Sequence, residues 1–380
     1  MKPDYAGGGL VNLMASIVAG RGGAPRHRTL ALLPPEKLLA AGNLVLLIID
    51  GLGDGYLRRR GAGGELERRR RGAITSVFPP TTASAITTSY TGCSPLEHGL
   101  TGWYTYFGGA GCVSAALPFK SRGDELSLRR RGFTPEKAFV QPSLFGSLPA
   151  RSIVVTYKDI IDSDYNVRHC MGAERRAYET LEELALQVET AVKSSNAKKF
   201  VYAYWPWYDS YSHRYGSESP QAFAELEKID AAFGRLLARL AGTDTLVIAT
   251  ADHGFIDSAP DESLELPASL ASQLRFPLCG ERRMAYCYVH SEKNFLQEAR
   301  EHFGDRADVR PSRELLEEGW FGPGEAHPGF GERIGDVALV MRGRYTIKDW
   351  TPGEARYLHI GNHGGTSENE MMIPLITEAA

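Results

Sequence analysis

The stretch NLVLLIIDGLGDG, residues 43–55, decides the fold class, because a continuous apolar run leads into an acidic residue and then into glycines. An apolar run of this length without alternation is typical of a strand that is covered on both faces of a parallel sheet. Asp50 closes the run, so we expect its carboxylate at the carboxyl end of the sheet, where α/β proteins bind ligands. The alternative role for Asp50 is to cap a following helix.

Three further apolar runs have the same character, and helical patterns lie between them. The runs cover residues 152–157 (SIVVTY), 199–205 (KFVYAYW) and 245–250 (TLVIAT). Apolar residues recur at helical spacing in residues 83–90, 174–193 and 220–240. Strands that alternate with helices predict an α/β fold with a doubly wound, mostly parallel sheet.

The segment of residues 256–350 breaks this alternation. It contains two strand-like runs and a helical pattern, at residues 284–290, 336–341 and 294–303. We therefore predict a catalytic α/β domain formed by residues 1–255 and 351–380, with residues 256–350 inserted as a small α+β subdomain. The first forty residues are expected to wrap the surface of the main domain.

Composition places the chain among ordinary globular proteins. Of its 380 residues 43% are hydrophobic and 23% are charged, and the net charge of −3 gives no reason to expect a nucleic-acid polymer as partner. The five cysteines form no C-x-x-C pair, which argues against a disulfide framework and against a structural zinc knuckle. No apolar stretch is long enough to span a bilayer, and the first twenty residues make a poor signal peptide, so a cytoplasmic location is expected.

Candidate nucleophiles lie in FPPTTASAITTSYTGCSPLEHG, residues 78–99. Two prolines turn the chain, and a helix is expected to begin near Ala83, which leaves Thr81 and Thr82 at its N-terminus. The free N–H groups and the positive partial charge of a helix N-terminus suit both a phosphate oxyanion and an alkoxide nucleophile. One threonine can instead be a simple helix cap, and Ser84 is a competing nucleophile.

Acidic and histidine side chains follow the later apolar runs. Asp209 and His213 are four residues apart, so on a helix they lie on one side and can hold one metal ion. Asp252 and His253 come just after a strand, and both can reach one metal ion if the glycine that follows them turns the chain. His363 lies in a glycine-rich loop before the apolar terminal segment. Each of these features alone is common by chance.

Taken in order, these motifs resemble the alkaline phosphatase superfamily, and its nucleotide pyrophosphatase/phosphodiesterase branch in particular. The resemblance covers residues 43–374. It rests on an Asp after an apolar strand, a threonine before T-G-x-x-P-x-x-H-G, then Asp-x-x-x-His, Asp-His-Gly and a late His-Gly. The resemblance implies a three-layer α/β sandwich and two divalent metal ions, most often zinc, with manganese possible.

The same resemblance implies roles for single residues. One metal ion would be held by Asp209, His213 and His363. The other would be held by Asp50, Asp252 and His253, with the nucleophile Thr82 beside it as a further ligand. Thr82 is preferred to Thr81 because it lies nine residues before Thr91 of TGCSPLEHG, which matches the offset in the family.

One departure from the family concerns the substrate pocket. The phosphodiesterase branch carries an Asn shortly after the H-G, where this chain has HGLTGWYTYF, residues 98–107, with Trp103 near that place. Support for a phosphoryl oxygen must then come from backbone N–H groups, from the metal ions or from another side chain. Trp103 and Tyr208 are the candidates for contact with the substrate.

These features predict a two-metal phosphohydrolase that acts on a small-molecule phosphate ester or phosphonate through a phosphothreonine intermediate. A phosphodiesterase or nucleotide pyrophosphatase is the first expectation. The alternatives are a phosphomonoesterase, a phosphonate hydrolase similar to phosphonoacetate hydrolase, and a catalytically silent binding protein of the same fold. A sulfatase is disfavoured because the chain contains no C-x-P-x-R or S-x-P-x-R run.

Overall fold

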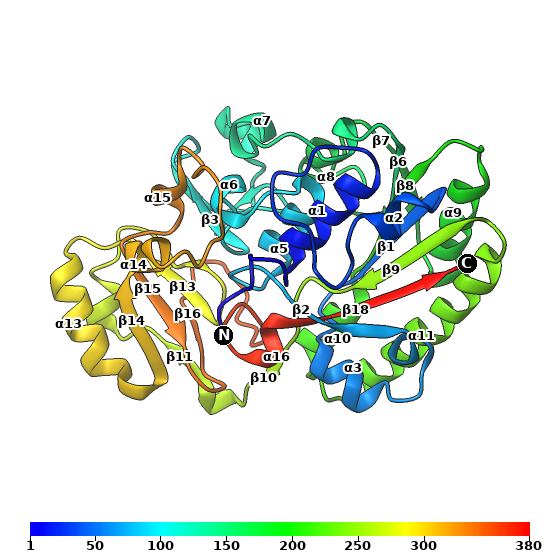
Figure 1. Ribbon diagram of the computed structural model, residues 1–380. Helices are drawn as coiled ribbons and strands as arrows, with labels where there is room; N and C mark the ends of the chain where they lie inside the picture. The colour runs from blue at the N-terminus through cyan, green and yellow to red at the C-terminus, as the bar shows by residue number, and fades with distance from the viewer.

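Two seven-stranded sheets organise the protein, for which the computed structural model describes residues 1–380 (Figure 1). The first sheet has the strand order β2-β18-β9-β1-β8-β6-β7, and its neighbouring strands from β9 to β7 are parallel. Strand β18 runs antiparallel to both of its neighbours. The strands of this sheet are β1 (Asn43–Ile49), β2 (Arg70–Thr75), β6 (Arg151–Tyr157), β7 (Ala173–Tyr178), β8 (Lys199–Trp205), β9 (Thr245–Thr250) and β18 (Met372–Ala379).

Helices cover both faces of the first sheet and make it the middle layer of a three-layer sandwich (Figure 1). One layer contains α1 (Leu10–Gly20), α5 (Thr82–Thr91) and α8 (Asp164–His169). The other contains α9 (Leu181–Lys193), α10 (Trp207–Tyr215) and α11 (Pro220–Leu240). Strands β1 and β8 are buried at all seven of their positions, as strands covered on both faces must be. The predicted α/β class with a mostly parallel sheet is confirmed.

The four apolar runs predicted as strands are β6, β8, β1 and β9, and they lie side by side in the sheet. The helix predicted over residues 174–193 is only partly correct, because residues Ala173–Tyr178 form β7 and helix α9 begins at Leu181. Strand β7 lies at the edge of the sheet and pairs with β6 alone. Its partly exposed positions accept charged residues, so it lacks the continuous apolar pattern of the central strands.

Helix α1 corrects the expectation that the first forty residues wrap the surface. Ten of its eleven residues are buried, because the sequence LVNLMASIVAG is apolar around nearly its whole circumference. The two polar side chains inside it bind the surrounding loop. Asn12 donates to the carbonyls of Tyr5 and Arg28, and Ser16 accepts from the N–H of Leu30.

The second sheet combines strands from two distant parts of the chain. Its order is β14-β15-β13-β12-β3-β4-β5, with antiparallel neighbours throughout. Its strands are β3 (Tyr104–Phe107), β4 (Cys112–Ala115), β5 (Lys120–Ser121), β12 (Cys279–Gly280), β13 (Met284–Cys287), β14 (Ala307–Pro311) and β15 (Val337–Met341). The predicted insertion of residues 256–350 therefore supplies only part of the small subdomain, together with helix α13 (Glu292–Phe303). Strands β3 to β5 are too short to be recognised from the sequence.

Two further properties concern the whole chain. None of the helices combines the length and the apolar character that crossing a bilayer requires. All five cysteines are unpaired, and all except Cys112 are buried. The buried thiols therefore contribute to apolar packing.

Candidate active site

The carboxyl ends of three neighbouring strands, β9, β1 and β8, carry most of the predicted site residues. Asp50 directly follows β1, while Asp252 and His253 follow β9 after one intervening residue. Strand β8 leads into α10, which presents Asp209 and His213 one helical turn apart. Because these strands are parallel neighbours, the side chains at their ends lie close together.

Two more site residues reach this edge of the sheet from other parts of the chain. Thr82 is the first residue of α5. His363 directly follows β17 (Gly361–Asn362), which pairs with β10 (Ile256–Asp257) just beyond the end of β9. The seven side chains predicted as nucleophile and metal ligands therefore meet at one place, although they are spread from residue 50 to residue 363.

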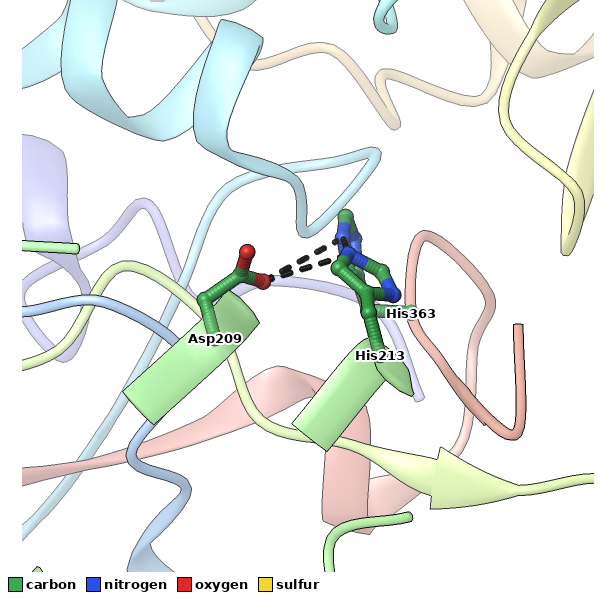
Figure 2. A group of neighbouring side chains, drawn as sticks. All are labelled: Asp209, His213 and His363. Carbon is green, nitrogen blue, oxygen red and sulfur yellow. Dashed lines mark hydrogen bonds and ion pairs between the residues drawn. The ribbon is translucent and has the colours of Figure 1, made fainter. Parts of the chain in front are cut away.

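Asp209, His213 and His363 form the first group of possible metal ligands (Figure 2). The Nε2 atom of His213 lies 3.3 Å from Asp209 Oδ1 and 3.2 Å from the Nε2 atom of His363. His363 Nε2 is 3.9 Å from the same Asp209 oxygen. The three atoms face one another, as ligands around a single cation do.

Asp50, Asp252, His253 and Thr82 form the second group, which adjoins the first. His253 Nε2 lies 3.3 Å from Asp50 Oδ1, 3.5 Å from Asp252 Oδ2 and 3.3 Å from the Thr82 hydroxyl oxygen. The Thr82 hydroxyl is also 3.5 Å from Asp50 Oδ1. His253 Nε2 is 3.9 Å from Asp209, so this carboxylate borders both groups.

Each of the three histidines has its Nδ1 atom bound to a backbone carbonyl. His213 Nδ1 donates to Gly361 at 2.9 Å, His253 Nδ1 to Gly254 at 3.2 Å and His363 Nδ1 to Pro80 at 3.3 Å. With Nδ1 bound in this way, the Nε2 atom of each ring is directed toward the shared space and is the atom that can bind a metal ion. Histidine ligands of metal ions are usually oriented in this way.

Hydrogen bonds satisfy only some of the carboxylate oxygens of the site: Asp50 accepts from the Tyr204 hydroxyl, and Asp252 accepts from the N–H groups of Gly51 and His253. Asp209 Oδ1 and Asp252 Oδ2 are buried without any hydrogen-bond partner. Burial, and then the nearby charge of Asp209, raises the pKa of Asp50 well above its ordinary value; burial and the charge of Asp50 do the same for Asp252. Bound cations would offset this clustered negative charge, so these residues fit a metal site.

Only one of the three candidate hydroxyls faces the carboxylates. The Ser84 hydroxyl donates to the carbonyl of Leu100 at 2.9 Å, and the Thr81 hydroxyl donates to Glu281 at 2.5 Å. Thr82 keeps its hydroxyl toward Asp50 and His253, as described above. It also opens α5, whose first turn leaves backbone N–H groups without helical partners.

A cavity of about 400 Å³ lies between the two groups and the second sheet. Thr82, Asp209, His213 and His363 line one side of it, and Trp103, which is 36% exposed, lines another. Tyr208 is not part of this lining. Its side chain is only 1% exposed and packs against Tyr56, with 5.4 Å between the ring centroids. The substrate contact predicted for Tyr208 is corrected accordingly, because Tyr208 lies on a different face of α10 from Asp209 and His213.

A charged hairpin at the cavity is missing from the sequence-based prediction. In CGERRM, residues 279–284, Glu281 accepts hydrogen bonds from the Thr81 hydroxyl and, at 2.6 Å, from the N–H of Trp103. Glu281 also packs against the loop that carries His363, where a Cβ on Gly364 would lie 2.7 Å from the Glu281 Cβ. Three charged residues in a row are typical of an exposed turn, so nothing in the sequence indicated these contacts.

Arg283 of the same hairpin forms a buried ion pair with Glu370, with both side chains at most 1% exposed. Glu370 also accepts from the N–H of Gly365 at 2.7 Å, so the pair fixes the loop behind His363. We expect Arg283→Met or Glu370→Gln to lower the free energy of unfolding by about 3–5 kcal/mol, because each leaves a buried group unpaired. Urea denaturation measures this loss. The double variant should lose less than the sum of the two single losses, and an additive result would contradict the pairing.

The fold and the grouped carboxylates and imidazoles together indicate the class of metal-dependent hydrolases of phosphoric esters with the alkaline phosphatase fold. The model of the type I phosphodiesterase/nucleotide pyrophosphatase family matches residues 44–366. The protein belongs to this family and is a phosphoric ester hydrolase. Metal dependence is typical of the family.

Solved structures share the fold at low sequence identity. Murine ectonucleotide pyrophosphatase/phosphodiesterase 5 has a TM-score of 0.66 at 15% identity, covering 89% of this chain and 88% of its own. The human protein of the same name has a TM-score of 0.65 at 17% identity, covering 88% and 87%. Phosphonoacetate hydrolase from Sinorhizobium meliloti 1021, in complex with phosphonoformate, has a TM-score of 0.63 at 18% identity, covering 88% and 89%. No curated protein matches the sequence.

Proposed function

We propose that the protein is a two-metal phosphohydrolase in which Thr82 is the nucleophile. The observation that carries this proposal is the position of the Thr82 hydroxyl, 3.3 Å from His253 Nε2 and 3.5 Å from Asp50 Oδ1 at the beginning of α5. A hydroxyl in this place stands beside the groups that would hold a cation and beside the free N–H groups of a helix N-terminus.

Two divalent cations complete the proposed site. One would be held by Asp209, His213 and His363, and the other by Asp50, Asp252 and His253, with Thr82 beside it. Nitrogen and carboxylate ligands of this kind suit zinc, and manganese is the alternative. When bound, the cations supply positive charge that favours the alkoxide form of Thr82 and offsets the charge on the phosphoryl oxygens.

The chain's own residues then perform the displacement in two steps. The Thr82 oxygen bonds to phosphorus, and the bond between phosphorus and the leaving group breaks, which gives a phosphothreonine. Water hydrolyses this ester and restores the Thr82 hydroxyl. The unpaired N–H groups of the first turn of α5 take over the phosphoryl-oxygen contact that an Asn makes in the phosphodiesterase branch.

A phosphodiester or nucleotide pyrophosphate is the proposed substrate, because the chain belongs to the family with that description. The second candidate is a phosphonate. It is favoured by Trp103, which lines the cavity near the place where the phosphodiesterase branch has its Asn. The similar fold of phosphonoacetate hydrolase agrees with it. In a phosphonate the bond that breaks is C–P, and the electron pair stays on carbon, which takes a proton from water.

A hydrolysis screen distinguishes these substrates. We expect bis(4-nitrophenyl) phosphate to be cleaved with a kcat/KM at least about tenfold above that of 4-nitrophenyl phosphate, a difference of about 1.4 kcal/mol. Release of nitrophenol, and of phosphate from phosphonoacetate, is measured with zinc and with manganese. A preference for phosphonoacetate would establish the phosphonate as substrate, and a preference for the monoester would indicate a phosphomonoesterase. Tight metal binding without turnover of any of the three would indicate a silent binding protein.

A further inference from the structure

The wall of the cavity that faces the second sheet carries three cationic side chains, Arg122, Arg282 and Lys348. Two of them are neutralised by carboxylates. Arg122 lies 2.8 Å from Asp349 and 3.1 Å from Glu354, and Lys348 is ion-paired with the same Glu354. These four charges balance one another, so neither Arg122 nor Lys348 offers an uncompensated charge to a ligand.

Arg282 is the exception among the three. It has no carboxylate oxygen within the 4.0 Å that defines an ion pair, and its side chain donates to the carbonyl of Tyr357 at 2.7 Å. A guanidinium has five N–H donors in a planar fork, so most of its donors remain without a protein partner. Burial lowers the pKa of Arg282, and the nearby charges of Glu281 and Glu354 offset this only in part.

The hairpin between β12 and β13 holds Arg282 in place. Its backbone is closed by hydrogen bonds between Glu281 and Met284, of 2.7 and 3.2 Å. On one side of Arg282, Glu281 is bound to the nucleophile segment, and on the other side Arg283 is paired with Glu370. A guanidinium between two anchored neighbours is preorganised, so little entropy is lost when it binds a ligand.

We propose that Arg282 binds a second oxyanionic group of the substrate, a carboxylate or a further phosphoryl group, while phosphorus lies beside Thr82. This inference rests on the proposed function and narrows its substrate class. It selects phosphoryl or phosphonyl compounds with an additional anionic group over simple esters that lack one. Thr82 and Arg282 line the same cavity of about 400 Å³. A planar guanidinium fork matches either oxyanion through paired hydrogen bonds.

Binding to metal-loaded protein in a Thr82→Ala background tests the proposal without turnover. The ligands are methylphosphonate, with one anionic group, phosphonoacetate, which adds a carboxylate, and ADP, which adds a phosphoryl group. We expect Arg282→Met to weaken the binding of phosphonoacetate or ADP by about 10- to 100-fold relative to the binding of methylphosphonate, as measured by calorimetry. The affinity of Arg282→Lys for these ligands should lie between that of the protein with Arg282 and that of Arg282→Met, because lysine keeps the charge but lacks the planar fork.

The pattern of losses separates the sources of the oxyanion. A loss of affinity for phosphonoacetate alone shows that Arg282 binds a carboxylate, and a loss for ADP alone shows that it binds a phosphoryl group. A loss of affinity for both ligands shows that Arg282 recognises either group. Equal changes for all three ligands in both Arg282 variants would overturn the proposal. These outcomes do not depend on catalysis. Absence of turnover in the wild-type screen would therefore count against the proposed function alone.

Discussion

Replacing Thr82 by alanine is expected to lower kcat/KM by at least about three orders of magnitude, because Thr82 is the one candidate nucleophile whose hydroxyl lies beside Asp50 and His253. The metal content should stay near two ions per chain, since the six Asp and His ligands remain. Initial rates with the preferred substrate of the screen and elemental analysis of the purified variant measure the two quantities. Loss of activity together with loss of metal would instead assign Thr82 a role in metal binding alone.

Three variants, one at Thr82 and two at neighbouring hydroxyls, are matched controls for this result. Thr82→Ser keeps an oxygen on the same Cβ and should recover part of the activity. Thr81→Ala and Ser84→Ala should have much smaller effects, because these hydroxyls are bound to Glu281 and to the carbonyl of Leu100. A phosphorylated form of the protein trapped by rapid acid quench should be found in the wild type and be missing in Thr82→Ala. Full activity of Thr82→Ala with inactive Thr81→Ala would move the nucleophile to Thr81.

The central sheet and the ends of its strands were predictable because of how parallel sheets are buried. Strands covered on both faces must be apolar at nearly every position, so the runs that became β1, β6, β8 and β9 stand out from the rest of the sequence. Polar residues directly after such strands are not needed for packing, which is why Asp50, Asp252 and His253 were predicted as site residues. The position of Asp209 and His213 on one side of α10 follows from helical spacing alone.

The elements outside the central sheet obey weaker rules and were predicted less well. Edge strand β7 contains charged residues at partly exposed positions, so its sequence was predicted as part of an amphipathic helix. Helix α1 is apolar on nearly all sides, so it lacks the amphipathic periodicity by which the other helices were predicted. The second sheet depends on pairing between strands of two to five residues that are far apart in the sequence. Such pairings have no local signature.

The choice among hydroxyls and the cavity wall also required three dimensions. Spacing relative to the T-G-x-x-P-x-x-H-G motif favoured Thr82, but only the hydrogen bonds of Thr81 and Ser84 show why those two are less available. The sequence GERRM is equally suitable for a solvated turn. Within this sequence, Glu281 contacts the segment of residues 81–103, whereas Arg282 contacts the segment of residues 350–359.

Removal of the metal ions is expected to abolish activity and to lower the melting temperature by roughly 10 °C. The estimate follows from about 4 kcal/mol of stabilisation per site when free metal exceeds the dissociation constant by about a thousandfold. The physical reason is that Asp50, Asp209 and Asp252 lie close together, with two buried carboxylate oxygens that have no hydrogen-bond partner. Scanning calorimetry before and after chelation, and again after addition of zinc or manganese, measures the change.

The melting-temperature difference between metal-loaded and metal-free protein should also grow as pH rises from 5.5 to 7.5. In the metal-free protein the pKa values of Asp50 and Asp252 are raised, so the folded state binds more protons than the unfolded state. Its stability therefore falls as pH rises from about 4, the unfolded value, through the raised folded values. Metal binding displaces those protons, so metal affinity rises over the same range.

Variants with single ligands removed connect this pH dependence to the proposed site. Asp252→Asn keeps the shape of the side chain but removes one charge, so it should weaken binding of the metal ion beside Thr82 and flatten the dependence on pH. His363→Ala should weaken binding of the other metal ion and leave the contribution of Asp50 and Asp252 to the pH dependence in place. If the chelated protein keeps its melting temperature and its activity, the grouped side chains do not hold metal ions. The assignment of Thr82 then loses its basis as well, because the proposed metal ions are the groups that would favour its alkoxide.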